Sequence, residues 1–219
     1  AHRVELALVG KASSEWENLL EEWEQSESHF TRTRCLERAQ DLKERIPVPP
    51  ALRYRFNHLV DQAETSLKAL VELQKNENEA HSYIKRGEEQ TDVGFLSRGG
   101  ETLVELLRRM ESEGPLWTKE ELESLRPGIE RSRQLIVQIF PQWIERQVPH
   151  GDSPDAISNF KDKMRRIGGN LKKLQLEQEH EALVAWVADR IRKAETVAEA
   201  RQLVRDVRSW MQQNSDACR

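Results

Sequence analysis

The sequence contains few of the residues that end helices or close tight turns. Among its 219 residues there are ten glycines and eight prolines, and they cluster at a few places. Runs of Val, Ile, Thr, Tyr and Phe, which are typical of β-strands, are missing. These absences exclude a strand-rich fold and favour long helices.

Cysteines and long apolar runs are also scarce. Cys35 and Cys218, the two cysteines, lie far apart in the sequence and make a poor disulfide framework, which favours a reducing compartment. No run approaches the roughly 18 consecutive apolar residues of a membrane span, and no signal peptide is recognisable. We therefore expect an intracellular protein, cytoplasmic or nuclear, without a membrane partner.

Charge is abundant but nearly balanced. Charged residues are 33% and hydrophobic residues 37% of the chain, against about 25% and about 45–50% in average soluble domains. The net charge is −4, so the molecule as a whole is not a binder of polyanions. Because the apolar residues are regularly spaced, we interpret the high charge as exposed helix surface and not as disorder.

Apolar residues recur at steps of three and four along most of the chain, which is the period of an amphipathic helix. The pattern predicts about seven helices with short connections, and short connections favour antiparallel neighbours. The expected fold is all-α: an elongated multi-helix bundle with coiled-coil-like seams. The clearest seam predicts a long helix over about 51–90, and it consists of Leu52, Phe56, Leu59, Ala63, Leu67, Leu70 and Leu73.

Polar residues mark several helix starts. Ser153 as N-cap with Pro154 in the first turn predicts the start of a second long helix, over about 154–194. Thr118 with Glu121 has the spacing of a capping box, in which each side chain accepts a hydrogen bond from the other residue's amide. Thr196 and Glu199 have the same spacing and predict the start of the last helix.

Glycine pairs and prolines predict interruptions. Gly99-Gly100 is expected to break the pattern before a short helix, and Gly168-Gly169 marks a hinge or a close helix contact. Pro127 and Pro141 fall inside one apolar pattern, which predicts kinks or two consecutive helices there. The turn around 114–118 divides the chain into an N-terminal helical region, 1–114, and a C-terminal helical bundle, 115–219; one continuous domain is the alternative.

One basic stretch stands out from the background. Its six residues lie within about four helical turns with one opposing acid, Asp162, and they are Lys161, Lys163, Arg165, Arg166, Lys172 and Lys173. Such a cluster can neutralise phosphates of a nucleic acid, dock an acidic protein surface, or form an ordinary solvated face. Aromatic residues interleaved with the cations, which single-strand binding would favour, are missing from this stretch.

The sequence contains six tryptophans, a residue enriched at binding hot spots. Most lie in phase with the apolar faces of helices, as core residues do. Trp117 lies in the predicted loop after Pro115 and is the candidate for an exposed interface anchor; core packing is the alternative for this residue too.

Patterns of catalytic or ligand-binding chemistry are lacking. There is no phosphate-binding glycine motif, no zinc-type cluster of His and Cys, and no nucleophile motif. Glu177 and His180 have the spacing of a di-iron ligand pair, but no second such pair exists. We expect no catalytic residues, no cofactor and no metal.

These observations predict a non-catalytic helical protein–protein interaction module: a scaffold, an adaptor or a subunit of a complex. One alternative is a nucleic-acid-associated subunit that uses residues 161–173. Another is a helical arm of a larger NTPase or enzyme, because the chain begins at Ala1 and not at Met, as a fragment does. Self-association is a further alternative to a different protein partner.

Overall fold

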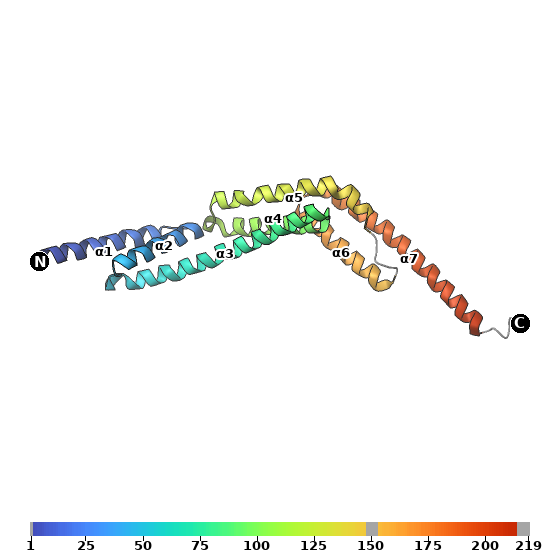
Figure 1. The fold of residues 1–219 in the computed structure, drawn as a ribbon, viewed down its shortest axis with the longest axis horizontal. Coiled ribbons are helices and arrows are strands. Elements are labelled where there is room, and N and C mark those ends of the chain that lie inside the picture. Colours follow the sequence, from blue (N-terminus) through green and yellow to red (C-terminus); the bar gives the residue numbers. More distant parts are fainter. Residues whose placement is uncertain (1, 148–152, 214–219) are drawn as a thin grey trace. The chain divides into compact units, whose positions relative to one another are not determined.

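The computed structural model describes residues 2–147 and 153–213. It confirms an all-α multi-helix bundle, and no strand occurs in these two ranges (Figure 1). Among the described helices none is long and apolar enough to cross a membrane. The seven α-helices are α1 (His2–Glu24), α2 (His29–Arg45), α3 (Arg53–Gln90), α4 (Val93–Glu113), α5 (Lys119–Glu145), α6 (Pro154–Lys173) and α7 (Glu177–Gln213), with short 3₁₀ turns at Pro50–Leu52 and Gly114–Leu116.

The helices build two compact units, each assembled from segments that are distant in the sequence. Unit 1 comprises residues 1–79 and 105–127, and unit 2 comprises residues 80–104 and 128–219. Helices α3, α4 and α5 each contribute to both units. A division of the chain at 114–118 stays a prediction.

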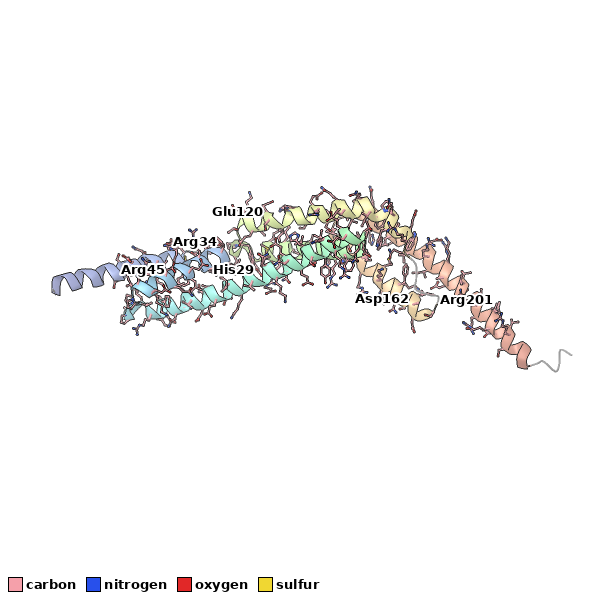
Figure 2. All side chains as sticks on the ribbon, viewed as in Figure 1. His29, Arg34, Arg45, Glu120, Asp162 and Arg201 are labelled. Atoms are coloured by element: carbon pink, nitrogen blue, oxygen red, sulfur yellow. The ribbon has the colours of Figure 1, made fainter. Side chains whose placement is uncertain are left out.

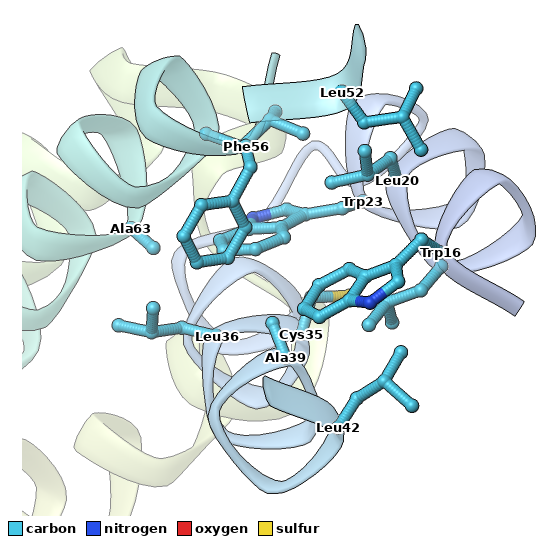
Figure 3. Packing of buried hydrophobic residues seen from close by; sticks show 12 residues of the cluster. Trp16, Leu20, Trp23, Cys35, Leu36, Ala39, Leu42, Leu52, Phe56 and Ala63 are labelled. Carbon is cyan, nitrogen blue, oxygen red and sulfur yellow. The ribbon is translucent and has the colours of Figure 1, made fainter. Parts of the chain in front are cut away.

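Unit 1 is organised around two tryptophans of α1 (Figure 3). Trp16 and Trp23 are fully buried, and each meets the ring of Phe56 edge-on, with centroid distances of 5.5 Å and 6.4 Å. The Trp16 indole Nε1 donates a hydrogen bond to the carbonyl of Ile46 at 3.1 Å, which ties α1 to the residue that ends α2. Aromatic pairs in this geometry add stability beyond the apolar area that they bury.

The predicted seam of α3 is correct as far as Ala63 and then shifts. Leu52, Phe56, Leu59 and Ala63 are buried, but Leu67 is 43% exposed, and Ser66 is buried in its place. The Ser66 hydroxyl lies 3.0 Å from Nδ1 of the buried His29 on α2. A hydrogen-bonded polar pair therefore fills the position where a pattern of apolar residues alone predicts leucine.

Unit 2 packs its helices closely at small residues. An added Cβ at Gly100 on α4 would lie 2.4 Å from the Ser132 hydroxyl on α5, and one at Gly99 would lie 2.7 Å from the carbonyl of Ala80 on α3. The prediction that Gly99-Gly100 breaks a helix is therefore wrong. These glycines lie inside α4, where they permit close approach of neighbouring helices.

Two other predicted boundaries between helices are also absent. Helix α5 runs through Pro127 and Pro141 as one helix, so the division into two helices is wrong, while a kink at these prolines stays a prediction. Helix α7 runs through Thr196, whose hydroxyl donates to the carbonyl of Arg192 at 2.9 Å, so Thr196 and Glu199 cap no helix start. By contrast, the Thr118–Glu121 capping box is confirmed: the Thr118 amide donates to Glu121 Oε2 at 2.7 Å, and the Glu121 amide donates to the Thr118 hydroxyl at 3.2 Å.

The predicted long helix over 154–194 is wrong because the chain turns between α6 and α7. Gln175 adopts a φ of 58°, in the left-handed region. The amide of Leu176 donates to the carbonyl of Leu171, and that of Gln175 to the carbonyl of Lys172. This pair of bonds is a Schellman motif, which ends a helix. Glycine usually occupies the left-handed position, and without a glycine there the sequence pattern continues across the turn.

Candidate functional site: a basic groove between α4 and α6

The basic stretch lies on α6, whose local sequence determines which residues face outward. The Ser153 hydroxyl accepts a hydrogen bond from the Ala156 amide at 3.2 Å and so caps the helix start, as predicted. The apolar face of α6 is buried and comprises Ile157, Phe160, Met164, Ile167 and Leu171. The cations occupy the remaining positions, where they are exposed or partly exposed.

Half of the six predicted cations are neutralised by carboxylates. Lys161 pairs with Glu195 of α7 at 3.1 Å, and Arg165 pairs with Asp162 of its own helix at 3.1 Å; Figure 2 marks Asp162 on α6. Lys173 pairs with Glu101 of α4 at 2.8 Å. These pairs are exposed, so each contributes little stability, but together they reduce the positive charge of the helix surface.

The other three cations are not neutralised by any carboxylate of the described residues. Within the described ranges Lys163, Arg166 and Lys172 form no ion pair: Lys163 donates to the side-chain oxygen of Gln147 at 3.2 Å, and Arg166 donates to the carbonyl of Asp162 at 3.4 Å. Lys172 is exposed and has no hydrogen bond of its side chain within the described part. The structure thus divides the predicted patch into a neutralised half and a free half.

Two of these free cations open onto a groove of unit 2 with a volume of about 880 Å³. The groove lies between the first half of α4 and the second half of α6. Four of its lining residues are basic and two are acidic, and the remaining five comprise two apolar side chains, two glycines and an asparagine. The lining residues are Asp92, Gly94, Phe95, Arg98, Glu101, Lys163, Arg166, Ile167, Gly169, Asn170 and Lys173.

A stack of rings and guanidinium groups flanks the groove. The rings of Tyr83 on α3 and Phe95 on α4 are nearly parallel, with an interplanar angle of 15° and centroids 6.3 Å apart. The guanidinium of Arg86 lies 4.3 Å from the Phe95 centroid, and that of Arg98 lies 4.2 Å from the Tyr83 centroid. Such contacts are favourable and hold Arg98 in place at the edge of the groove.

Sequence reasoning missed this aromatic component because it comes from other helices. Phe95 is distant from 161–173 in the sequence, and a second Schellman motif places it there. Thr91 adopts a φ of 49°, and the Asp92 amide donates to the carbonyl of Gly87 at 2.9 Å, so α3 ends and α4 turns back. The one local signal is that Tyr83 and Phe95 each precede an arginine by three residues.

Trp117 lies in the loop that the sequence predicts, and of its two predicted roles core packing is the one that the structure supports. The prediction of an exposed anchor is wrong, since the side chain is 6% exposed. Its indole meets the His29 ring edge-on at 4.7 Å and donates a hydrogen bond to the carboxylate of Glu113. The 3₁₀ turn at Gly114–Leu116 folds the indole back onto unit 1, because Gly114 has a φ of 63°.

Among the described side chains, no group of three or more His, Cys, Asp and Glu residues is placed to hold a metal ion. His180, the candidate ligand beside Glu177, lies against α6: an added Cβ at Gly168 would be 3.4 Å from its ring. That distance is an ordinary van der Waals contact, and an added Cβ at Gly169 meets no atom within 4 Å, so both predicted roles of Gly168-Gly169, a hinge and a close helix contact, stay predictions.

Comparison with protein-family models, with curated proteins and with solved structures found no match to this chain.

Proposed function

We propose that this chain is a non-catalytic helical protein–protein interaction module and that the groove between α4 and α6 receives an acidic segment of a protein partner. The observation that carries the proposal is the composition of the groove, which combines an excess of basic side chains with apolar surface from Phe95 and Ile167. An acidic segment with one apolar face complements both features.

The arrangement of charge favours a protein over a nucleic acid. Neutralising a phosphate backbone requires a row of cations, and each phosphate contact strengthens the dependence of binding on salt. Here three of the six cations of α6 are paired with carboxylates, and Asp92 and Glu101 line the groove itself. Fixed carboxylates repel phosphates, whereas an acidic peptide with a few carboxylates can place them beside Lys163 and Arg166.

The nucleic-acid-associated subunit remains the second candidate, because of one specific observation. Tyr83, Phe95 and Arg98 supply the stacked rings and guanidinium that single-stranded nucleic acids bind, at the edge of a groove with basic residues. This candidate predicts that binding weakens steeply with salt. A helical arm of a larger NTPase or enzyme stays a prediction without a structural observation in its favour.

The proposal is tested with the full chain as bait in cell extract, with and without nuclease, and with proteins read by mass spectrometry. The informative comparison is between the wild type and Arg166→Glu. We expect a stoichiometric protein that survives nuclease and is lost with Arg166→Glu. Lys172→Glu is the matched control, because Lys172 lies on the same helix but outside the groove lining, and it is expected to retain the partner.

A steric variant separates charge from shape. Gly169 lines the groove, and an added Cβ there meets no atom within 4 Å. Gly169→Phe is therefore expected to fill the groove and displace the partner while every charge is kept. Protein partners that ignore both Arg166→Glu and Gly169→Phe would contradict the proposal, and partners lost on nuclease treatment would support the nucleic-acid alternative.

A further inference from the structure

The second half of α7 carries an apolar stripe that no described residue of unit 2 covers. Four of its side chains are between 46% and 65% exposed, and they are Val197, Leu203, Val204 and Val207. Every side chain from Glu199 to Ser209 is exposed. The first half of α7 differs. There Leu183 is buried, and the ring centroids of Trp186 and of Phe160 on α6 are 6.2 Å apart.

The exposed stripe has the period of a helix-packing seam. Val197, Ala200, Val204 and Val207 follow one another at steps of three, four and three residues, and Leu203 widens the same face. That spacing is the heptad pattern of helices that pack side by side. A helix of roughly four turns without a packing partner is only marginally stable in water, so the stripe predicts a partner helix.

The charges beside the stripe differ on its two sides. With about 100° of rotation per residue, Glu199 and Asp206 fall on one flank and Arg201 and Arg208 on the other. One flank is therefore acidic and the other basic; Figure 2 marks Arg201 on α7. All four side chains lie in the exposed segment.

This asymmetry identifies the partner. When two copies of one helix pack in parallel about a twofold axis, each flank of one copy faces the opposite flank of the other. The acidic flank then meets the basic flank on both sides of the interface. In an antiparallel pair each flank faces its own equivalent, which sets like charges against each other and is unfavourable. We propose that residues 197–209 of α7 pair in parallel with the same segment of a second copy of this chain.

The first test is the mass of the full chain in solution, measured by sedimentation equilibrium. We expect a dimer whose dissociation constant rises at least about a hundredfold in Val204→Glu/Val207→Glu, because four exposed valines per dimer lose their burial. Both residues are exposed in the single chain, so the monomer fold is expected to survive, with an unchanged helical signal in circular dichroism. Gln202→Glu, on the opposite face of α7, is the matched control and should leave the dimer intact.

The second test is a charge exchange. Arg201→Glu/Arg208→Glu makes both flanks acidic, and Glu199→Lys/Asp206→Lys makes both flanks basic. Each variant alone is expected to be monomeric, and an equimolar mixture is expected to restore the dimer. Variants that each dimerise as tightly as the wild type would overturn the role of the flanks.

The third test fixes the direction of pairing. In a chain with Cys218→Ser, Val197→Cys is expected to form a disulfide-linked dimer under mild oxidation, because equivalent residues face each other in a parallel pair. The chain with Cys218→Ser alone is the control. If Val197→Cys instead formed a disulfide only with a Val207→Cys chain, that result would overturn the parallel arrangement. A wild-type chain that stays monomeric up to about 100 µM would overturn self-association altogether, since specific interfaces are populated well below that concentration.

Discussion

The imidazole of His29 and the indole of Trp117 meet edge-on with their centroids 4.7 Å apart, inside unit 1. His29 comes from the first turn of α2, and Trp117 follows the 3₁₀ turn after α4. Two segments distant in the sequence are therefore joined at a titratable side chain. Nδ1 of the His29 ring lies 3.0 Å from the Ser66 hydroxyl of α3. Contacts of three segments therefore depend on the protonation state of His29.

The first prediction is that acid destabilises unit 1 through His29. Burial lowers the pKa of His29 below 6.5; Glu113 and Glu121 oppose this shift and Arg32 adds to it. The unfolded chain therefore binds a proton at a higher pH than the folded chain does. The stability that neutral His29 gives to unit 1 is fully present above about pH 6.5, and it is lost as the pH falls toward the pKa of His29 in the folded chain. We expect a lower urea midpoint at pH 5.5 than at pH 7.5.

The variant that checks this prediction is His29→Gln, which keeps a polar group near Ser66 but does not titrate. Its stability at pH 7.5 is expected to be lower than that of the wild type, and the decisive quantity is the change between the two pH values. That change should be smaller in the variant. An equal change in both proteins would assign the acid sensitivity to other groups.

The second prediction contrasts the two buried tryptophans of α1. Both meet Phe56 edge-on, but Trp16 Nε1 donates to the carbonyl of Ile46, whereas Trp23 Nε1 is buried with no hydrogen-bond partner in the described part of the chain. Trp16→Phe removes an N–H donor that forms a hydrogen bond, whereas Trp23→Phe removes a buried N–H donor that forms none in the described part of the chain. We expect Trp16→Phe to lower the free energy of unfolding by about 1 kcal/mol more than Trp23→Phe does.

Chemical unfolding of both single variants, followed by circular dichroism, measures this difference. The comparison is matched because the two side chains are equally buried and lose the same ring atoms. A larger loss for Trp23→Phe would mean that packing, and not the hydrogen bond to Ile46, determines the ranking.

The third prediction concerns the turn that places Phe95 beside the groove. Thr91 is exposed and β-branched, and it holds a φ of 49°, which is unfavourable for such a residue. Glycine adopts this conformation without strain. Thr91→Gly is therefore expected to raise the free energy of unfolding of unit 2 by about 0.5–1 kcal/mol.

The matched control for Thr91→Gly is Lys85→Gly, an exposed position inside α3. There glycine adds conformational freedom to the unfolded chain without relieving any strain, and it should cost about 1 kcal/mol. If both variants destabilise unit 2 alike, the strain at Thr91 does not contribute.

Local signals in the sequence predicted the elements that depend on neighbouring residues. The apolar spacing of α3 as far as Ala63, the capping box at Thr118 and the N-cap at Ser153 all act within one or two turns, and all three are confirmed. The Thr196–Glu199 pair has the same residues and spacing as a capping box. It fails because a hydroxyl inside a helix is equally well satisfied by the carbonyl four residues earlier.

The features that sequence reasoning missed depend on tertiary structure. Both Schellman turns place a residue other than glycine, Thr91 or Gln175, in the left-handed region, so no residue type marks them. At Gln175 the turn is supported from outside, since Arg133 of α5 donates to the carbonyl of Leu174 at 2.9 Å. The groove combines α4 with α6, and Trp117 is buried by His29. None of these partners can be identified from spacing along one helix.

The last prediction uses the contrast between two glycines of unit 2. An added Cβ at Gly100 would lie 2.4 Å from the Ser132 hydroxyl, whereas one at Gly169 meets no atom within 4 Å. Gly100→Ala is expected to destabilise unit 2 by about 1–3 kcal/mol, because α4 and α5 must move apart. Gly169→Ala is expected to stabilise it by about 0.5–1 kcal/mol, because alanine loses less conformational freedom in a helix.

A double variant tests whether the contact with Ser132 is the cause. Ser132→Gly removes the atoms that an alanine at 100 would meet, and it also removes the hydrogen bond from the Ser132 hydroxyl to the carbonyl of Leu96 at 2.8 Å. If the Ser132 contact causes the loss, Gly100→Ala/Ser132→Gly should cost less than the sum of the two single variants, by about 1 kcal/mol or more. Additive losses, measured by urea unfolding, would instead assign the cost of Gly100→Ala to its other neighbour, Leu174, whose Cδ2 lies 2.9 Å from the added Cβ.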